Sequence, residues 1–402
     1  MKNKTLLVLF SIVFFSACRT KQYVSKTPIS QTAADTTIVF KIPVDTFSQH
    51  KTISSTSYII NPETYYTDAF YELKDMLEGK KELSFKRAVF ITENAYFENQ
   101  LDYNSYCKYI LRLADICKRW KNINRLKNYK YIDSNAVSTN GAIFHVMSDT
   151  LYDKNKNIIK LPFTYDFNDC FAKNHWENMF VSKLIVTNKG NCHSLPFLYK
   201  ILAEEFKVPA YLSIVPNHIY IRNRCKKTGW YNTEMTNAMF PTEAWVMTSG
   251  YVSVNSIVSG IYMDTLSLKQ SVVVCVNDLA KGYQRKFKNA DLQFILNCCK
   301  LGLEYYPNYA ELLLLKAETH KKIYENYIAK YGLNVQQSEL YGEKIKNHLS
   351  EMDKTYDLLA RLDYREIPEE MFLEWIKSLE NNKEKYQDKK ISDTFNYEKK
   401  QP

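Results

Sequence analysis

Three residues of the sequence, Cys192, His218 and Glu234, have types and an order that could together carry out a reaction. Cys192 follows the turn-forming Gly190 and precedes an apolar run that predicts a helix from residue 195 to residue 206. The N-terminus of a helix carries partial positive charge and unpaired backbone N–H groups, so it favours a thiolate and could bind an oxyanion. These features predict nucleophilic attack by the Cys192 thiol on an acyl carbon.

A thiol nucleophile needs a base, and the base needs a group that orients it. His218 begins an apolar, β-branched segment that predicts a strand, so it is the candidate base. The next predicted strand, residues 230–236, holds Asn232 and Glu234 two positions apart, and both side chains therefore point to one face. Either side chain could therefore meet the His218 ring from the neighbouring strand.

The elements around these residues predict an α+β fold. The helix at 195–206 is followed by strands at 208–215, 218–222 and 230–236, which is the order of a helix followed by antiparallel strands. Apolar residues at helical spacing predict a helical region before this core, ending near Trp120, and another from about 270 to 380. Residues 125–170 give no clear pattern.

The order of cysteine, histidine and acid resembles that of transglutaminase-like domains, which are relatives of papain-type thiol enzymes. Members of that family show Gly-x-Cys, then a histidine in an apolar strand, then a tryptophan four residues before an aspartate that Pro-Thr follows. Gly190 to Cys192, His218 and the Trp230–Glu234 spacing match this pattern. The match covers roughly residues 165–245.

The resemblance implies roles and also leaves differences. It implies Cys192 as nucleophile, His218 as base and Glu234 as orienting acid, without a metal or other cofactor. Glutamate replaces the usual aspartate at 234, and a methionine replaces the proline at 235, whereas the threonine at 236 is kept. Papain-type enzymes use asparagine as the third residue, which keeps Asn232 open.

Two asparagines near the nucleophile are candidates for binding an oxyanion. An amide side chain usually completes the oxyanion hole in enzymes of this kind, and Asn188 and Asn191 lie close to Cys192 in the chain. His193 is adjacent to the nucleophile, but one step along a helix its side chain should point elsewhere. We therefore expect no catalytic role for His193.

The segment after residue 270 resembles a tetratricopeptide helix pair, although about three extra residues separate its helices. A plain helical bundle is the alternative. Domains of the transglutaminase-like type followed by such helices form a known arrangement, which implies a possible protein partner on the C-terminal helices. The matching residues are Leu279, Ala280 and Tyr283 in the first helix, then Ile295, Cys299 and Gly302 before Pro307.

The start of the chain resembles the lipobox of bacterial lipoproteins. Two lysines precede an apolar run at 6–15, which is too short to span a bilayer, and Ser16-Ala17-Cys18 follows. In that family the chain is cut before the cysteine, which carries the lipid. We expect lipidation of Cys18, attachment to the membrane, and a place in the cell envelope; Arg19 favours the outer membrane, with its face undetermined.

Composition bounds the organisation. The chain of 402 residues is too long for one core and is 45% hydrophobic, and its formal net charge of +10 includes no basic cluster with nucleic-acid spacing. Cysteines other than Cys18 and Cys192 are expected to be buried without a disulfide framework. The predicted divisions are a signal peptide at 1–17, a tether at 18–58, a helical region at 59–125, the transglutaminase-like domain at 126–250, tetratricopeptide-like helices at 251–380 and a frayed charged tail at 381–402.

Two functions follow from these observations. The first is a membrane-anchored thiol enzyme that hydrolyses or transfers acyl groups of peptide or protein amides outside the cytoplasm. The second is a non-catalytic binding scaffold that keeps the fold and uses its helices to bind protein. Neither function involves a nucleic acid.

Overall fold

The computed structural model describes residues 62–331, 343–381 and 383–399. Helices alternate with four small sheets, which confirms a mixed α+β fold. The predicted signal peptide, the lipobox with Cys18 and the whole predicted tether lie outside the described residues. Within the described residues, no helix is both long and apolar enough to cross a membrane.

Three helices form the first part of the described chain, as the sequence predicted. They are α1 (Glu63–Leu77), α2 (Phe85–Tyr96) and α3 (Tyr103–Ile123). Ser84 caps α2 and Asp102 caps α3, because each side chain accepts a hydrogen bond from a backbone N–H of the first turn.

Residues 125–170, which gave no clear pattern, contain the helix α4 (Ser134–Ser148) and three short strands, β2 (Leu151–Tyr152), β3 (Ile158–Lys160) and β4 (Thr164–Tyr165). Most of α4 is buried, including polar residues. Asn140, for example, donates a hydrogen bond to the Pro209 carbonyl at 3.0 Å. Because the helix is buried on most sides, its sequence lacks the alternation of apolar and polar faces that predicts a helix.

The sheet that carries His218 has three antiparallel strands in the order β6 (Tyr211–Val215), β7 (His218–Cys225) and β8 (Gly229–Thr233). Val215 pairs with His218 across the first hairpin. The strand predicted at 230–236 ends at Thr233, and Glu234 instead forms an isolated bridge with Met239. The predicted order of helix and strands is otherwise present.

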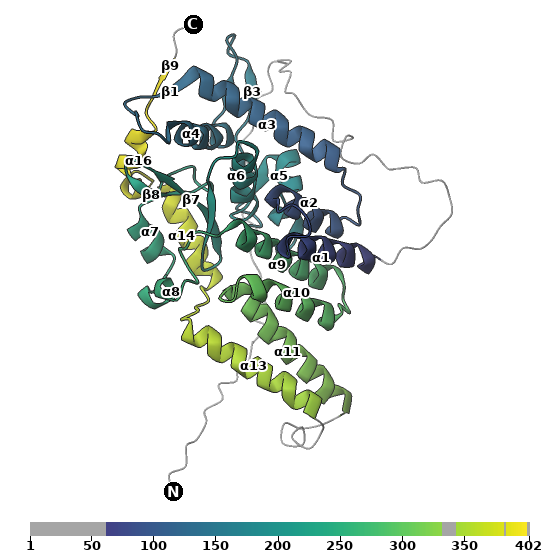
Figure 1. Ribbon diagram of the computed structural model, residues 1–402. Coiled ribbons are helices and arrows are strands. Elements are labelled where there is room, and N and C mark those ends of the chain that lie inside the picture. The colour runs from purple at the N-terminus through teal and green to yellow at the C-terminus, as the bar shows by residue number, and fades with distance from the viewer. Residues whose placement is uncertain (1–61, 332–342, 382, 400–402) are drawn as a thin grey trace, which may run out of the picture. The chain divides into compact units, whose positions relative to one another are not determined.

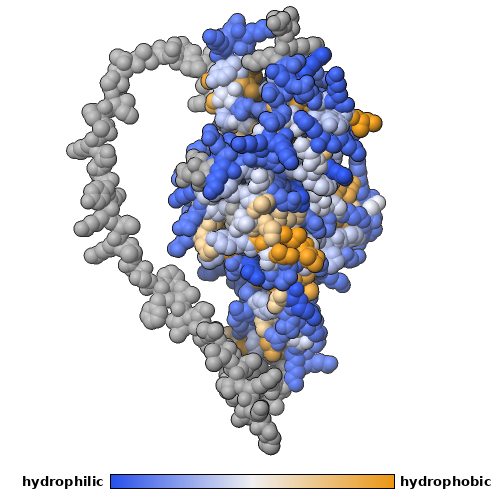
Figure 2. Space-filling model, turned by 90° about the vertical axis from the view of Figure 1, so that its left-hand side faces the viewer, coloured by the Kyte–Doolittle hydropathy of each residue, from blue (hydrophilic) through white to orange (hydrophobic). Residues whose placement is uncertain are grey.

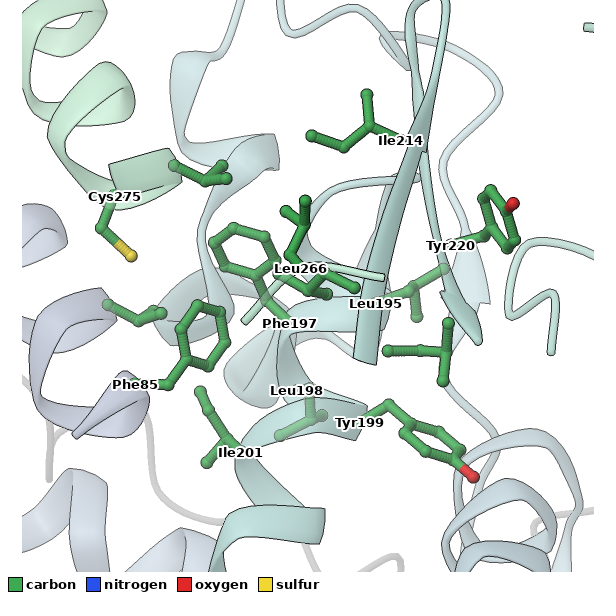
Figure 3. Packing of buried hydrophobic residues seen from close by; sticks show 14 of the residues in the cluster. Phe85, Leu195, Phe197, Leu198, Tyr199, Ile201, Ile214, Tyr220, Leu266 and Cys275 are labelled. Atoms are coloured by element: carbon green, nitrogen blue, oxygen red, sulfur yellow. The ribbon is translucent and has the colours of Figure 1, made fainter. Parts of the chain in front are cut away.

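The helix α6 (Ser194–Glu205) lies at the centre of the core. Figure 3 shows Leu195, Phe197, Leu198 and Ile201 of this helix among buried side chains from other helices and from the sheet. The ring of Phe197 meets that of Phe85 edge to face, with 4.9 Å between ring centroids. Burial of each such side chain contributes roughly 1.5–3 kcal/mol. Packing around α6 therefore fixes the segment that precedes it, which carries Cys192.

The helices after residue 267 pack in sequence along one part of the molecule (Figure 1). Gly302 of α10 lies directly against α11, because an added Cβ would lie 2.3 Å from the Cδ2 atom of Leu312. Two helices, α9 and α10, are present in the segment predicted as a helix pair, and the glycine permits close packing of the next helix. The bounds are α9 (Leu268–Lys286), α10 (Leu292–Tyr305), α11 (Ala310–Tyr331) and α13 (Glu343–Arg361).

The prediction of a frayed tail is wrong for residues 383–399. After α14 (Glu369–Asn381), the chain forms α15 (Lys383–Tyr386), α16 (Lys389–Thr394) and β9 (Tyr397–Lys399), which pairs with β1 (Asn124–Leu126). Phe395 stacks on Phe240 with 4.8 Å between ring centroids. The prediction followed the many charged residues of this segment, whereas a few large apolar residues in it pack into the core.

One buried hydrophobic cluster reaches from Tyr66 to Phe395. It includes side chains from the N-terminal helices, the sheet, the helices after residue 267 and the C-terminal segment. The divisions predicted near residues 125, 250 and 380 therefore do not coincide with breaks in the core.

Candidate functional site

Cys192 lies in a turn between β5 (Lys189–Gly190) and α6, two residues before the helix begins. The side chain of Asn191 fixes this turn, since its Oδ1 accepts from the N–H groups of His193 and Ser194 and its Nδ2 donates to the Cys170 carbonyl at 3.0 Å. A Cβ at Gly190 would lie 2.4 Å from Ser194 Oγ, so a larger residue there would displace the Ser194 side chain. Cys192 is half-buried between these fixed neighbours.

His218 begins β7 directly after a tight hairpin. Asn217, in that hairpin, has a φ of 57°, a left-handed conformation that asparagine tolerates better than most residues. The Asn217 carbonyl oxygen lies 3.8 Å from Cys192 Sγ, and the thiol can donate to it. The hairpin therefore brings the histidine strand and the cysteine turn together.

His218 and Glu234 form a buried ion pair. Nε2 of His218 lies 2.6 Å from Oε2 of Glu234, and the two side chains are 1% and 4% exposed. The other carboxylate oxygen of Glu234 accepts from the backbone N–H of Thr236 at 2.8 Å. The bridge between Glu234 and Met239 holds the backbone on both sides of the carboxylate.

The charges of this pair stabilise one another against the effect of burial. Burial lowers the pKa of His218, but the Glu234 carboxylate and the Cys192 thiol outweigh it and raise that pKa to about 10. Burial likewise raises the pKa of Glu234, but the charge and hydrogen bond of His218 and the hydrogen bonds from Thr236 leave it below its usual value. The site therefore holds an imidazolium and a carboxylate at neutral pH.

The second ring nitrogen of His218, Nδ1, is buried and makes no hydrogen bond of normal geometry within the described part of the chain. The Cys192 thiol is nevertheless close enough to the ring to raise its pKa. Since Glu234 occupies Nε2, the nitrogen that remains for exchanging a proton with the thiol is Nδ1.

The alternative third residue does not reach the histidine. Asn232, on β8, donates from Nδ2 to the Pro241 carbonyl at 3.2 Å. Its backbone pairs with Arg222, four positions along β7 from His218. Of the two residues proposed from the sequence, Glu234 is therefore the one that contacts the base.

Asn188 and Asn191 were the candidates for binding the oxyanion, and no hydrogen bond joins either side chain to the Cys192 thiol within the described residues. The amide nitrogen of Asn191 is already used by Cys170 and lies 3.0 Å from Met179 Sδ. Asn188 is the left-handed C-cap of α5 (Val181–Thr187), and its carbonyl accepts from the N–H of Thr164 at 2.8 Å. These contacts give both residues a part in holding the backbone before Cys192, and an oxyanion role for either one stays a prediction.

Two groups near the thiol were not predicted from the sequence. The backbone N–H of Cys192 has no acceptor among the described residues, so it could bind an oxyanion. Tyr165, on β4, pairs with Gly190 of β5, and its hydroxyl is buried without a partner in the described residues. Burial and the nearby Cys192 and Cys170 thiols raise the pKa of Tyr165 well above its usual range, so the hydroxyl keeps its proton.

The C-terminal helix α14 covers the histidine. The ring of Trp375 stands nearly perpendicular to that of His218, with 4.7 Å between centroids and an angle of 80°. Asn217 donates from Nδ2 to the Ile367 carbonyl at 3.0 Å, which ties the hairpin to the segment before α14. In Figure 1, α14 lies beside β7, in agreement with the contact between Trp375 and His218. An aromatic residue in a distant helix gives no sequence signal for this contact.

Comparisons with known proteins do not assign the chain to a class. No protein family matches the sequence, and no curated protein matches it. A solved structure that it is similar to is that of menin, described as revealing the binding site for the Mixed Lineage Leukemia (MLL) protein. That likeness covers 83% of this chain and 95% of menin, at 8% identity and a TM-score of 0.30, which is too low to establish a shared fold.

Proposed function

We propose that this chain is a thiol enzyme of the transglutaminase-like type, acting on acyl groups of peptide or protein amides. The observation that carries the proposal is the His218–Glu234 ion pair at 2.6 Å, buried beside the Cys192 thiol. In this arrangement Cys192 is the nucleophile, His218 transfers protons and Glu234 holds the charged ring. The chain then has a transglutaminase-like core followed by tetratricopeptide-like helices.

The reaction begins with a thiolate and an imidazolium, because His218 holds the proton that Cys192 gives up. The thiolate attacks the carbonyl carbon, and the oxygen that becomes negative accepts from the free backbone N–H of Cys192. As the tetrahedral intermediate collapses, the C–N bond breaks and the leaving nitrogen takes the proton from Nδ1 of His218. An acyl thioester and a neutral imidazole remain.

The second half of the reaction restores the site. Water or an amine attacks the thioester and gives a proton to the neutral His218. The C–S bond then breaks, which returns the thiolate and the imidazolium. Water as the attacking group makes the reaction a hydrolysis, and an amine makes it an acyl transfer.

The cover over His218 supports this chemistry. Trp375 keeps water from the ion pair, and a low dielectric strengthens the attraction between imidazolium and carboxylate. Cys192 remains half-buried, so the nucleophile is the most accessible of the three residues. A substrate would approach from the side of the thiol while the proton-transfer pair stays covered.

A non-catalytic binding scaffold is the second proposal, and an exposed apolar surface favours it. Val254 and Val258 of α8 (Val254–Val258) are 62% and 81% exposed. Figure 2 shows a hydrophobic patch on the side of the molecule where Figure 1 places α8. Patches of this kind often mark contacts between proteins.

The enzyme proposal is tested by alkylating the protein with iodoacetamide and measuring modification of Cys192 by peptide mass spectrometry. At pH 6 we expect His218→Ala to react at least about tenfold more slowly than wild type, since a general base contributes roughly 10²–10⁴-fold. Cys107, also half-buried, gives an internal reference in every sample. Equal rates at Cys192 in the two proteins would leave the scaffold as the better proposal.

We further propose that lipid on Cys18 anchors the chain in the cell envelope, on the outer membrane. The basis is the lipobox-like Ser16-Ala17-Cys18 sequence. Growth of the expressing bacterium with an alkynyl fatty acid should label the wild-type chain and not Cys18→Ser. Equal labelling of the two would contradict the proposal.

A further inference from the structure

A second buried histidine pair lies next to the nucleophile. Nε2 of His193 is 2.9 Å from Oδ2 of Asp278, and Nδ1 of His193 is 2.9 Å from the Met179 carbonyl oxygen. Asp278 belongs to α9, so the pair connects the Cys192 turn with a helix 85 positions further along the chain. Both side chains are at least nine-tenths buried.

The hydrogen bonds of His193 leave its ring no nitrogen for proton transfer. A carbonyl oxygen only accepts, so Nδ1 must carry a proton. Nε2 and Asp278 then share a second proton, whichever of the two atoms holds it. Because both nitrogens are occupied, His193 cannot act as a base towards Cys192.

Glu93 is another buried acid close to the His193–Asp278 pair, and it bonds to backbone N–H groups and not to the His193 ring. Glu93 of α2 accepts from the N–H groups of Val181 and Ser182 at 2.6 and 2.8 Å, at the start of α5. Burial raises its pKa to about 7, against the effect of those hydrogen bonds and of His193. The cavity among Glu93, His193 and Asp278 is about 10 Å³, which is too small for any substrate.

The surroundings of the pair show what it holds in place. Before Cys192, the Asn191 side chain donates to the Cys170 carbonyl. After Cys192, Ser194 Oγ donates to the Asn178 carbonyl at 3.0 Å, and the His193 side chain reaches Asp278 of α9. Met179 and Asp278, which bind that side chain, lie on separate segments, so the ring is held at both ends. Replacing a buried ion pair by apolar residues is often neutral or stabilising, so stability alone is a weak explanation for this pair.

We propose that the His193–Asp278 pair is a positioning device that ties the nucleophile turn to α9 and holds Cys192 in reach of His218. The inference rests on the proposed function, because it assumes that Cys192 reacts. Asp278, a residue of the C-terminal helices, would thus affect the position of the Cys192 thiol through His193, without touching the thiol itself. Movement of α9 would therefore change the reactivity of Cys192.

The test uses two substitutions of Asp278. Asp278→Leu removes the bond to His193, and Asp278→Asn can keep it, because the amide can donate to an unprotonated Nε2. A displacement of about 1 Å can cost on the order of 10²-fold in rate. We expect Asp278→Leu to lower the alkylation rate of Cys192 at pH 6 by about tenfold or more, and Asp278→Asn to stay within about twofold of wild type.

A matched control separates positioning from loss of stability. Thr319 is buried in α11 and donates to the Leu315 carbonyl, so Thr319→Val also changes a buried polar group of the C-terminal helices. It should lower the melting temperature without changing Cys192 alkylation measured well below that temperature. If Asp278→Leu does not fold, Asp278→Ser removes the same bond with a smaller side chain.

Hydrogen exchange at the amides of residues 191–194 gives a second readout that does not require a reactive thiol. The proposal predicts faster exchange there in Asp278→Leu and wild-type exchange in Asp278→Asn. Wild-type alkylation and wild-type exchange in Asp278→Leu would overturn it. If wild type and His218→Ala alkylate equally, the proposed enzyme function fails, and the exchange result still decides whether Asp278 positions the turn.

Discussion

Two buried histidine–carboxylate pairs lie near Cys192, and they differ at one nitrogen. In the pair of His218 and Glu234, the ring keeps Nδ1 without a hydrogen bond to any described residue. In the pair of His193 and Asp278, a backbone carbonyl occupies the corresponding nitrogen. Burial and a carboxylate are common to both, so the free nitrogen is what distinguishes a proton-transfer pair from a positioning pair.

Of the substitutions considered for the two pairs, His218→Ala should have the largest effect on stability and on the reactivity of Cys192. His218→Ala takes away the proton acceptor and leaves Glu234 as an unpaired buried charge, which costs roughly 3–5 kcal/mol. We expect a melting temperature well below that of wild type, besides the slow alkylation of Cys192.

The matched control for this substitution uses a partly exposed pair. His145, which stacks on Trp120, lies 2.7 Å from the half-exposed Asp149, and an exposed pair of this kind contributes about 0–1 kcal/mol. His145→Ala should leave alkylation of Cys192 at pH 6 unchanged. Loss of Cys192 reactivity in His145→Ala as large as in His218→Ala would show that the effect is not specific to the site.

The second prediction concerns the third residue. Glu234→Gln keeps the shape but removes the charge that raises the pKa of His218, so the alkaline limit of Cys192 reactivity should move down from about pH 10. Asn232→Ala removes a side chain of the same strand region that bonds to Pro241 instead of to the histidine. The measurement is the pH dependence of the alkylation rate, and a downward shift in Asn232→Ala with none in Glu234→Gln would assign the role to Asn232.

The third prediction is the pH dependence of stability. The raised pKa of His218 stabilises the fold fully below its ordinary value of 6.5, and this contribution is lost as pH rises through about 10. The lowered pKa of Glu234 stabilises the fold above its ordinary 4.5, and that contribution is lost as pH falls through the folded value. Urea unfolding should therefore show wild type losing on the order of 2–4 kcal/mol more than His218→Ala between pH 7 and pH 10.

Urea unfolding as a function of pH can also contradict the claim that His218 and Glu234 form a charged pair. If the free energies of unfolding of wild type and His218→Ala fall in parallel between pH 7 and pH 10, His218 carries no raised pKa in the folded state. The loss of unfolding free energy below pH 4.5 is then an independent check on the lowered pKa of Glu234.

The smallest effect on the reactivity of Cys192 is expected from substitution of Trp375, which covers His218. Trp375→Phe keeps an aromatic ring over His218, whereas Trp375→Ala opens the ion pair to water. We expect Trp375→Ala to destabilise the fold by about 3–5 kcal/mol and to change Cys192 alkylation by only severalfold. A complete loss of alkylation in Trp375→Phe would instead indicate that the indole N–H itself takes part in the reaction.

The two pairs also show what the sequence could predict. His218 and Glu234 are 16 positions apart. Alternation along a strand placed Asn232 and Glu234 on one face, and the resemblance to the Trp230–Glu234 spacing of transglutaminase-like domains favoured Glu234. Asp278 is 85 positions from His193 on another helix, and no local pattern indicates that contact. His193 was therefore expected to have no role, although its ring is held at both nitrogens.

In other parts of the fold, too, the features with a local sequence pattern were predicted and those without one were missed. The three N-terminal helices and the order of β6, β7 and β8 were predicted, because their apolar spacing reflects one buried face. The helix α4 was missed because it is buried on most sides, and the segment 383–399 because its charged residues outnumber its buried aromatic ones. The turn roles of Asn188 and Asn191 depend on backbone geometry that spacing does not reveal.

The most direct test of the account is the protonation of His218 itself. Histidine labelled with ¹⁵N reports each of the seven rings, and His218→Ala identifies the signal. The account predicts that His218 stays an imidazolium through pH 8, loses its proton near pH 10, and titrates at lower pH in Cys192→Ala, because the thiol contributes to the raised pKa. A His218 ring that titrates near pH 6.5 and is unaffected by Cys192→Ala would contradict a thiolate–imidazolium site.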